Sequence, residues 1–167
     1  MENPRFLGDA TVGKLVRYLR ALGLDAAWMN TTQPNPLKRR ALQENRILLT
    51  RKVALQSLTA QGVQVHLLTT EIPWQQVREI LRMYRPRLHP FSRCIECNVP
   101  LQPVPREEAK GHVPYYTWRT QPRFYRCPSC GRFYWPGTHL QAMDRRFQEF
   151  LGDLYHKPQR VEEGGKE

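Results

Sequence analysis

The sequence predicts an α/β fold in which a small parallel sheet is flanked by helices, followed by a four-cysteine zinc ribbon and a C-terminal helix. Up to about residue 90, short strand signals alternate with helical segments, the pattern typical of βαβ crossovers and a mainly parallel sheet. All four cysteines then fall within residues 91–137, where helical periodicity is weak. A chain of 167 residues can bury a sufficient core without disulfides.

Four short segments carry the strand signals: residues 5–9, 25–29, 46–50 and 63–67. Apolar residues from Val12 to Leu22 recur at helical spacing, and Gly23 supplies a stop. Prolines open a basic helix over residues 34–44, and a further helix is expected over residues 52–60. The last helix of this half begins at Pro73 and ends at Pro86.

A final amphipathic helix is expected over residues 138–154. Its apolar residues, from Leu140 to Leu154, fall on one face and should pack against the rest of the protein. The expected organisation is therefore a domain at residues 1–90, a ribbon at 91–137 and a packed helix at 138–155. Residues 156–167 lack core-forming side chains and are expected to be disordered.

The chain is strongly basic, with 26 Lys and Arg against 15 Asp and Glu, and a net charge of +11. Most of the basic residues are arginines, and the planar guanidinium group can donate two parallel hydrogen bonds to a phosphate, which a lysine ammonium matches less well. Such a balance favours nucleic acid as a partner over an anionic membrane, although an arginine-rich proteome would also produce it. The longest uncharged stretch, residues 53–70, is too polar to span a membrane. With no signal-peptide core at the start, a cytoplasmic location is expected.

The cysteines form the most specific motif. Cys94 and Cys97, and then Cys127 and Cys130, make two C-x2-C pairs separated by 29 residues. Two residues between ligands let both sulfurs of one turn reach the same ion, and four soft sulfurs select Zn²⁺. A closed four-sulfur set leaves no position for water, so the zinc would be structural. Two disulfides, a dithiol redox pair or a mononuclear iron site are the alternatives.

Arginines and aromatic residues alternate around the second cysteine pair. Arg123, Arg126 and Arg132 lie among rings that could stack on unpaired bases while the guanidinium groups contact phosphates. The same rings could instead form the core of the ribbon, since strand alternation buries every second one. Tyr115, Tyr116 and Trp118 lie in an inserted loop and are expected to be more exposed.

The motifs together resemble a known family. Residues 6–9 and 13–20, the segment Ile47-Leu48-Leu49-Thr50-Arg51, and the ribbon segments 90–94, 103–108, 124–128 and 134–139 are similar to the Mut-seven C-terminal ribonuclease domain family. The resemblance covers roughly residues 5–150. It implies a PIN-like nuclease fold, in which acids at the carboxyl ends of parallel strands hold Mg²⁺ or Mn²⁺ to hydrolyse RNA phosphodiesters.

The acids of that family are incomplete here. Asp9 stands at the position of the family's first acid, but Lys52 replaces the aspartate expected after the third strand. The stretch after the second strand, residues 30–35, has no carboxylate, and Glu71 is a loosely aligned second candidate ligand. An ammonium within about 4 Å of Asp9 would attract it by roughly 4 kcal/mol at an effective dielectric of about 20. The metal site is therefore expected to be lost or severely weakened, and Asp9 could serve instead as a helix cap.

Without its acids, the edge formed by the strand ends should be electropositive. The residues expected to contact nucleic acid are Lys14, Arg17, Arg20, Lys38, Arg39, Arg40, Arg51, Lys52, Arg123, Arg126 and Arg132. The favoured function is RNA binding, or binding to a ribonucleoprotein, by a PIN-like domain with a degenerate nuclease site. Two alternatives stay open: a working ribonuclease using Asp9, Glu71 and Mg²⁺ or Mn²⁺, and an adaptor subunit of a ribonucleoprotein assembly.

Overall fold

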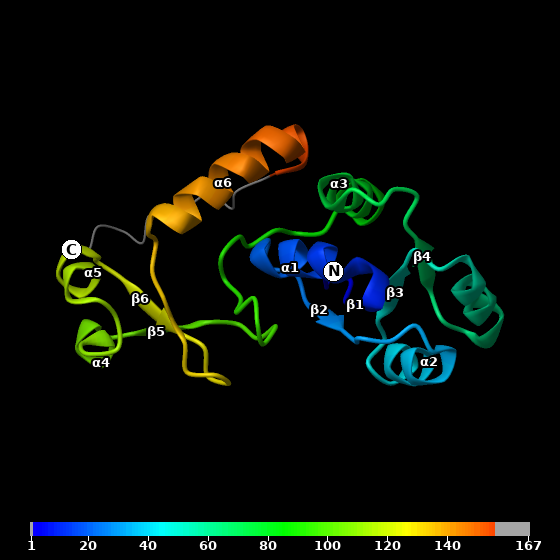
Figure 1. Cartoon of the computed structure of the whole chain (residues 1–167), viewed down its shortest axis with the longest axis horizontal. Coiled ribbons are helices and arrows are strands. Elements are labelled where there is room, and N and C mark those ends of the chain that lie inside the picture. The colour runs from blue at the N-terminus through cyan, green and yellow to red at the C-terminus, as the bar shows by residue number, and fades with distance from the viewer. Residues whose placement is uncertain (1, 156–167) are drawn as a thin grey trace.

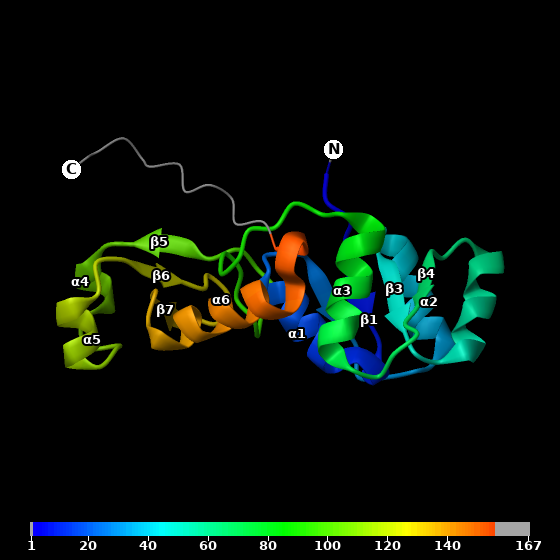
Figure 2. The ribbon, with the colours of Figure 1, turned by 90° about the horizontal axis from the view of Figure 1, so that it is seen from above.

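The computed structural model describes residues 2–155, and its first half is a four-stranded parallel sheet with helices on both faces (Figures 1 and 2). The strands are β1 (Phe6–Gly8), β2 (Ala26–Trp28), β3 (Ile47–Thr50) and β4 (Val65–Leu67). They pair in the order β2-β1-β3-β4, and every pairing is parallel. The α/β fold class is confirmed, and each strand lies inside the segment expected for it.

Helices connect the strands. The α-helices are α1 (Gly13–Ala21), α2 (Pro34–Gln43) and α3 (Pro73–Tyr84), and a short 3-10 turn, η1 (Ala10–Val12), precedes α1. The helix expected after β3 is present as a 3-10 helix, η2 (Val53–Gln61). Its two buried residues, Leu55 and Leu58, are three positions apart, which matches the three residues per turn of that helix.

Alternation along the strands divides the core between the two faces of the sheet. Phe6 and Leu49 pack with α1 and α3, whereas Leu7 and Leu48 pack with α2 and η2. All four of these side chains are fully buried. The continuous apolar strands therefore reflect burial on both faces, as a parallel sheet requires.

The cysteine-containing half forms a second, antiparallel sheet in the order β5-β6-β7. These strands are β5 (Gln102–Val104), β6 (Phe124–Arg126) and β7 (Phe133–Tyr134). The segment inserted between β5 and β6 contains two short helices, α4 (Arg106–Ala109) and α5 (Tyr115–Thr120). They lie at the end of the molecule far from the parallel sheet (Figure 1).

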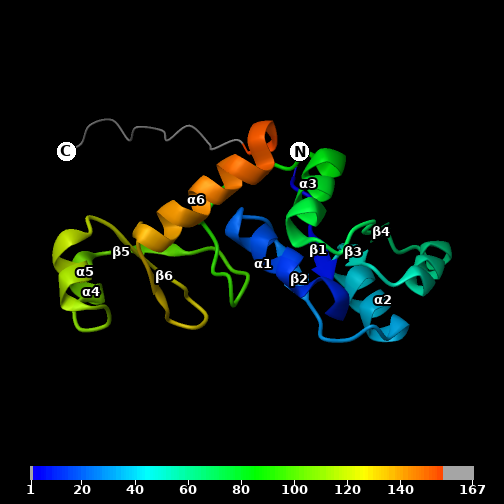
Figure 3. The same ribbon diagram turned by 45° about the horizontal axis from the view of Figure 1, so that its top comes forward.

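The last helix, α6 (Thr138–Leu151), runs from the antiparallel sheet back to α1 and α3 and continues into the 3-10 turn η3 (Gly152–Leu154) (Figure 3). Phe147 is fully buried, with ring centroids 5.6 Å from Trp74 and 6.0 Å from Phe91. The domain boundaries expected from the sequence stay predictions, and the tail expected to be disordered, residues 156–167, lies outside the described residues. No helix in residues 2–155 combines the length and apolar character needed to cross a membrane.

Candidate functional site

The topology of the parallel sheet defines where a ligand site is expected. From β1 the chain crosses to β2 on one side, and then returns to β3 on the other side of β1. In open α/β sheets, ligands bind beyond the carboxyl ends of the strands at such a switch point. Asp9 follows β1 directly and Thr50 ends β3, so both lie at this position.

Asp9 is fully buried, and three short hydrogen bonds engage both of its carboxylate oxygens. The backbone N–H of Thr11 donates to Oδ1 at 2.9 Å, and the Thr11 hydroxyl donates to the same oxygen at 2.5 Å. The Thr50 hydroxyl donates to Oδ2 at 2.5 Å. Asp9 is also the N-cap residue of η1, so its expected capping role is confirmed.

Threonine hydroxyls, and not the Lys52 ammonium, are the groups that contact Asp9. Among the ion pairs of the described residues, none joins Lys52 to Asp9. The Lys52 backbone N–H donates to the Thr50 hydroxyl at 2.9 Å, and the Arg51 N–H donates to the Thr11 hydroxyl at 3.0 Å. The two hydroxyls therefore connect the buried carboxylate to the loop after β3, while the side chains of Arg51 and Lys52 are exposed.

The other positions that would carry acids offer no further carboxylate cluster. Glu71 is exposed in the turn between β4 and α3, and Asn30 is exposed after β2. Within residues 2–155, the only group of three or more His, Cys, Asp or Glu side chains close enough to hold one ion is the cysteine cluster. Asp9 and Glu71 as catalytic residues therefore stay a prediction.

The basic residues expected to contact nucleic acid fall into two groups. Several are already engaged within the protein: Arg20 with the backbone oxygens of Ala26 and Ile95, Arg17 and Arg132 with Glu96, Lys38 with Gln61, Arg40 with Glu44, and Arg126 with the ring of Phe133. Within the described residues, the side chains of the others are exposed and make no hydrogen bond or ion pair: Lys14, Arg39, Arg51, Lys52 and Arg123. Lys14, Arg51 and Lys52 belong to the segments that follow β1 and β3.

The four cysteines converge in the ribbon as the C-x2-C spacing predicts. Their sulfur atoms all lie within 4.8 Å of one another, and Cys94 Sγ is 3.9 Å from Cys130 Sγ. All four are free cysteines, so the disulfide alternative is not what the structure shows. A tetrahedral ion with metal–sulfur distances of about 2.3 Å requires sulfurs about 3.8 Å apart. The cluster therefore fits a single tetrahedral metal ion.

The turn of the second cysteine pair has the geometry of a metal-binding knuckle. Cys130 N–H donates to Cys127 Sγ at 3.4 Å, and Gly131 after the second pair has a φ of +76°. Burial and hydrogen bonding with Cys130 raise the pKa of the Cys97 thiol to about 12. A coordinated metal ion supplies the positive charge that stabilises the thiolate form of its cysteine ligands.

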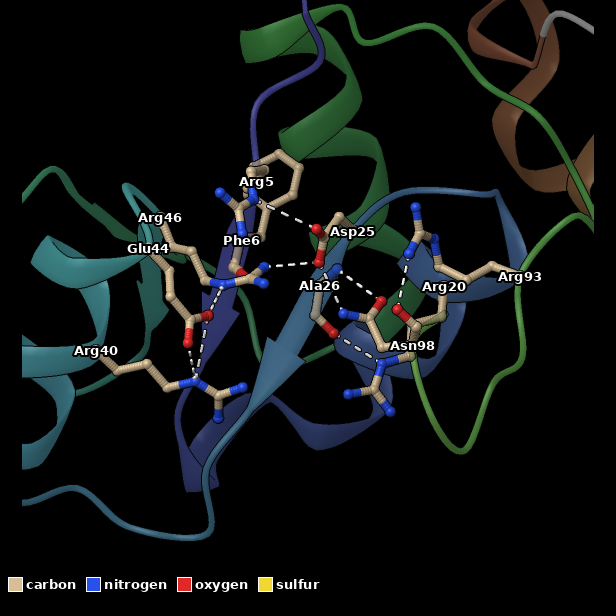
Figure 4. A network of polar contacts seen from close by, with 10 residues as sticks. All are labelled: Arg5, Phe6, Arg20, Asp25, Ala26, Arg40, Glu44, Arg46, Arg93 and Asn98. Carbon is tan, nitrogen blue, oxygen red and sulfur yellow. Dashed lines mark hydrogen bonds and ion pairs between the residues drawn. The ribbon is translucent and has the colours of Figure 1, made fainter. Parts of the chain in front are cut away.

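A polar network joins the first knuckle to the parallel sheet (Figure 4). Asn98, directly after Cys97, has a φ of +59° and takes part in two hydrogen bonds with the start of β2. Its amide donates to Asp25 Oδ1 at 2.7 Å, and its side-chain oxygen accepts from the Ala26 N–H at 3.0 Å. Asp25 in turn pairs with Arg46 at 2.7 Å. The knuckle is therefore held against the sheet by specific polar contacts as well as by packing.

Sequence reasoning missed both the Asn98 network and the threonines around Asp9. The sequence offered little indication of either, because threonine, as at Thr50, is common in strands, and Asn98 is one polar residue in a loop. Of the rings near the second knuckle, Phe124 is fully buried, and Tyr125, Phe133 and Tyr134 are partly buried. These four rings therefore contribute mainly to the core of the ribbon.

Comparison with known proteins supports the resemblance found in the motifs. The sequence matches the Mut7-C RNAse domain over residues 4–147, which is most of the chain. Searches of curated proteins and of solved structures gave no match. With the parallel sheet, the acid after β1 and the four-cysteine cluster all inside the matched region, the chain belongs to the Mut7-C RNAse domain family.

Proposed function

We propose that this protein binds RNA at the carboxyl edge of its parallel sheet and does not cleave it. The proposal rests on the hydrogen bonds of Asp9. Its two carboxylate oxygens accept three hydrogen bonds from Thr11 and Thr50. A nuclease metal would have to displace these donors and would gain only one carboxylate. Because hard divalent ions need several oxygen ligands, such a site binds them weakly.

The surface beside Asp9 suits the anionic partner. Lys14, Arg51 and Lys52 are exposed and belong to the two segments that meet at the switch point. The Asp9 side chain is fully buried and hydrogen-bonded to Thr11 and Thr50, so exposed basic side chains, and not this carboxyl group, face the solvent there. Phosphate contacts of this kind provide affinity without sequence specificity.

The cysteine cluster would hold a structural zinc ion through Cys94, Cys97, Cys127 and Cys130. Zinc would cross-link the two knuckles and fix the antiparallel sheet, and a set of four thiolates leaves it no open position for substrate. Its proposed role is therefore to hold the ribbon in shape beside the basic sheet edge.

Incubation with labelled single-stranded RNA and Mn²⁺ tests the proposal. Binding should weaken steeply with added salt, and the RNA should stay intact, because phosphate contacts release counterions but no metal activates water. Lys52→Ala should weaken binding for all sequences and reduce the magnitude of the salt slope by about 1, the value expected for one phosphate contact. Arg82→Ala, which removes an exposed cation on α3, is the matched control and should leave binding unchanged.

The family match favours ribonuclease activity as a second candidate. In that case the incubation would cut the RNA, and Asp9→Asn would abolish the cutting while the protein kept its fold and its zinc. If RNA binding were undetectable at about 100 mM salt, where phosphate contacts still contribute, the proposal would be wrong and an adaptor role would be favoured.

A further inference from the structure

The structure assigns a second contact for RNA, a base-stacking platform formed by Tyr115 and Tyr116 on α5. This inference rests on the proposed RNA binding and adds the class of group that is recognised, the unpaired base of a single strand. Tyr115 is 66% exposed and Tyr116 is 77% exposed. Within residues 91–137 they are the only large hydrophobic side chains that are exposed in the described structure.

The platform is fixed to α4 by Trp118, which lies two residues after Tyr116 on α5. The Trp118 indole N–H donates to the Arg106 backbone oxygen at 2.9 Å, and the Arg106 guanidinium donates to the Trp118 backbone oxygen at 2.6 Å. This reciprocal pair connects α4 to α5, and the ring of Tyr115 lies 6.0 Å from that of Trp118. The two tyrosines are therefore presented by a structured segment, so less conformational entropy is lost when they bind a ligand.

Two cations lie beside the Trp118 ring, which is next to Tyr115. The Arg106 guanidinium and the Lys110 ammonium lie 5.0 Å and 5.1 Å from the centroid of the Trp118 ring. Residues 109–143 contain five Lys or Arg and no Asp or Glu. The nearest acids in sequence are Glu107 and Glu108 on α4, so the balance of the segment is cationic. An anionic chain would therefore be attracted to the surface on which the two rings are exposed.

These features favour single-stranded RNA over a protein partner. Single strands combine phosphates with flat bases, and aromatic side chains beside cations bind both, with each stacked base contributing about 1–3 kcal/mol. An apolar protein-docking face would expose aliphatic side chains as well, and the exposed hydrophobics within residues 91–137 are only these two tyrosines. A duplex would hide its base faces and so gain nothing from them.

The platform and the sheet edge lie at different ends of the molecule. Figure 3 shows α4 and α5 beyond the antiparallel sheet, away from the four parallel strands. One RNA strand that contacted both places would have to run along the molecule. Stacking at the tyrosines would then add affinity that does not depend on salt to the salt-dependent binding at the sheet edge.

The test uses the full chain and a fluorescently labelled single-stranded oligoribonucleotide. Tyr115→Ala and Tyr116→Ala should each weaken binding by about 5-fold to 150-fold with an unchanged salt slope, the loss expected for one stacked base. Tyr115→Phe and Tyr116→Phe keep the rings and should keep the affinity. Met83→Ala, which removes an exposed side chain on α3, is the control and should have no effect. Circular dichroism and zinc content verify that each variant is folded.

Ultraviolet cross-linking provides an independent readout, and the cross-linked peptide should contain Tyr115 or Tyr116. The inference is wrong if both alanine variants bind like the parent chain while Lys52→Ala weakens binding; the proposed RNA binding would then stand. If the parent chain binds no RNA, both fail. If the alanine variants lose the same affinity for duplex RNA as for single-stranded RNA, base stacking is wrong. The tyrosines would then contact the sugar-phosphate backbone of the RNA.

Discussion

Replacement of Cys127 by alanine is expected to release the metal ion and to unfold the antiparallel sheet. The Cys127 side chain is fully buried at the start of the second knuckle, and a three-sulfur set no longer encloses the ion. In small zinc modules, metal binding contributes about 10–16 kcal/mol of apparent free energy, most of which is folding free energy.

Metal analysis and limited proteolysis measure this effect. The parent chain should hold one zinc ion, whereas Cys127→Ala should hold almost none and should be cut readily within residues 91–137. Ser129→Ala lies in the same turn and removes a hydrogen bond to Cys97 but no ligand, so it should keep both the zinc and the resistance to protease. A Cys127→Ala variant that kept its protease resistance without metal would show that packing alone holds the ribbon together.

Loss of the ion should also loosen the contact between the ribbon and the parallel sheet. Asn98 follows the ligand Cys97 directly, and its side chain bonds to Asp25 and to the Ala26 N–H. If the first knuckle relaxes, these hydrogen bonds are lost and Asp25 keeps fewer donors. The Cys127→Ala variant should therefore show a lower melting temperature for the parallel-sheet half as well.

Replacement of Arg46 by methionine is expected to cost about 2–4 kcal/mol of the free energy of unfolding. Arg46 is 7% exposed and pairs with Asp25 at 2.7 Å and with Glu44 at 2.5 Å. It also donates to the Phe6 backbone oxygen at 3.0 Å, so the substitution removes three polar contacts at once. Breaking a fully buried pair costs about 3–5 kcal/mol, and the 27% exposure of Asp25 reduces this value.

Chemical denaturation of Arg40→Met provides the matched control. Arg40 pairs with the same Glu44, but at the surface and one helical turn away, so the cost should stay below about 0.5 kcal/mol. If both variants lost the same free energy of unfolding, the burial of Arg46 would not contribute to the strength of its ion pairs.

The Arg46 network also predicts sensitivity to acid. Burial raises the pKa of Asp25, but hydrogen bonds from Arg46 and Asn98 outweigh burial and the net shift is downward. A hydrogen bond from Arg46 likewise lowers the pKa of Glu44. Depressed carboxyl pKa values stabilise the fold above the unfolded values, about 3.9 for Asp and 4.3 for Glu, and this stability is lost as pH falls through the folded values. Arg46→Met should reduce that loss of stability in acid.

Much of the fold could be predicted because its signals are local. The strand at residues 47–50 is a short apolar run between charges, and α3 begins at Pro73 and ends at Tyr84, two residues before Pro86. The cysteine cluster followed from spacing alone. In contrast, the sequence predicted η2 as a helix but not as a 3-10 helix. Over nine residues, a period of 3.6 residues per turn is hard to distinguish from one of 3.0.

The contacts of Asp9 could not be predicted in the same way. The identity of Lys52 suggested an ion pair, but the chain direction after β3 aims its backbone N–H at Thr50 instead. Thr11 and Thr50 are separated by 38 residues, and only the parallel pairing of β1 with β3 brings both hydroxyls to one carboxylate. Asn98 and Asp25 are likewise distant in sequence, and their contact depends on how the ribbon packs against the sheet.

The proposed loss of the nuclease metal site at Asp9 is best tested by titration with Mn²⁺, in which electron paramagnetic resonance measures the free ion. We expect no saturable binding tighter than about 1 mM, because Asp9 is a single carboxylate already satisfied by its hydrogen bonds. One Mn²⁺ bound per chain with micromolar affinity, and lost in Asp9→Asn while the zinc content stayed the same, would contradict it.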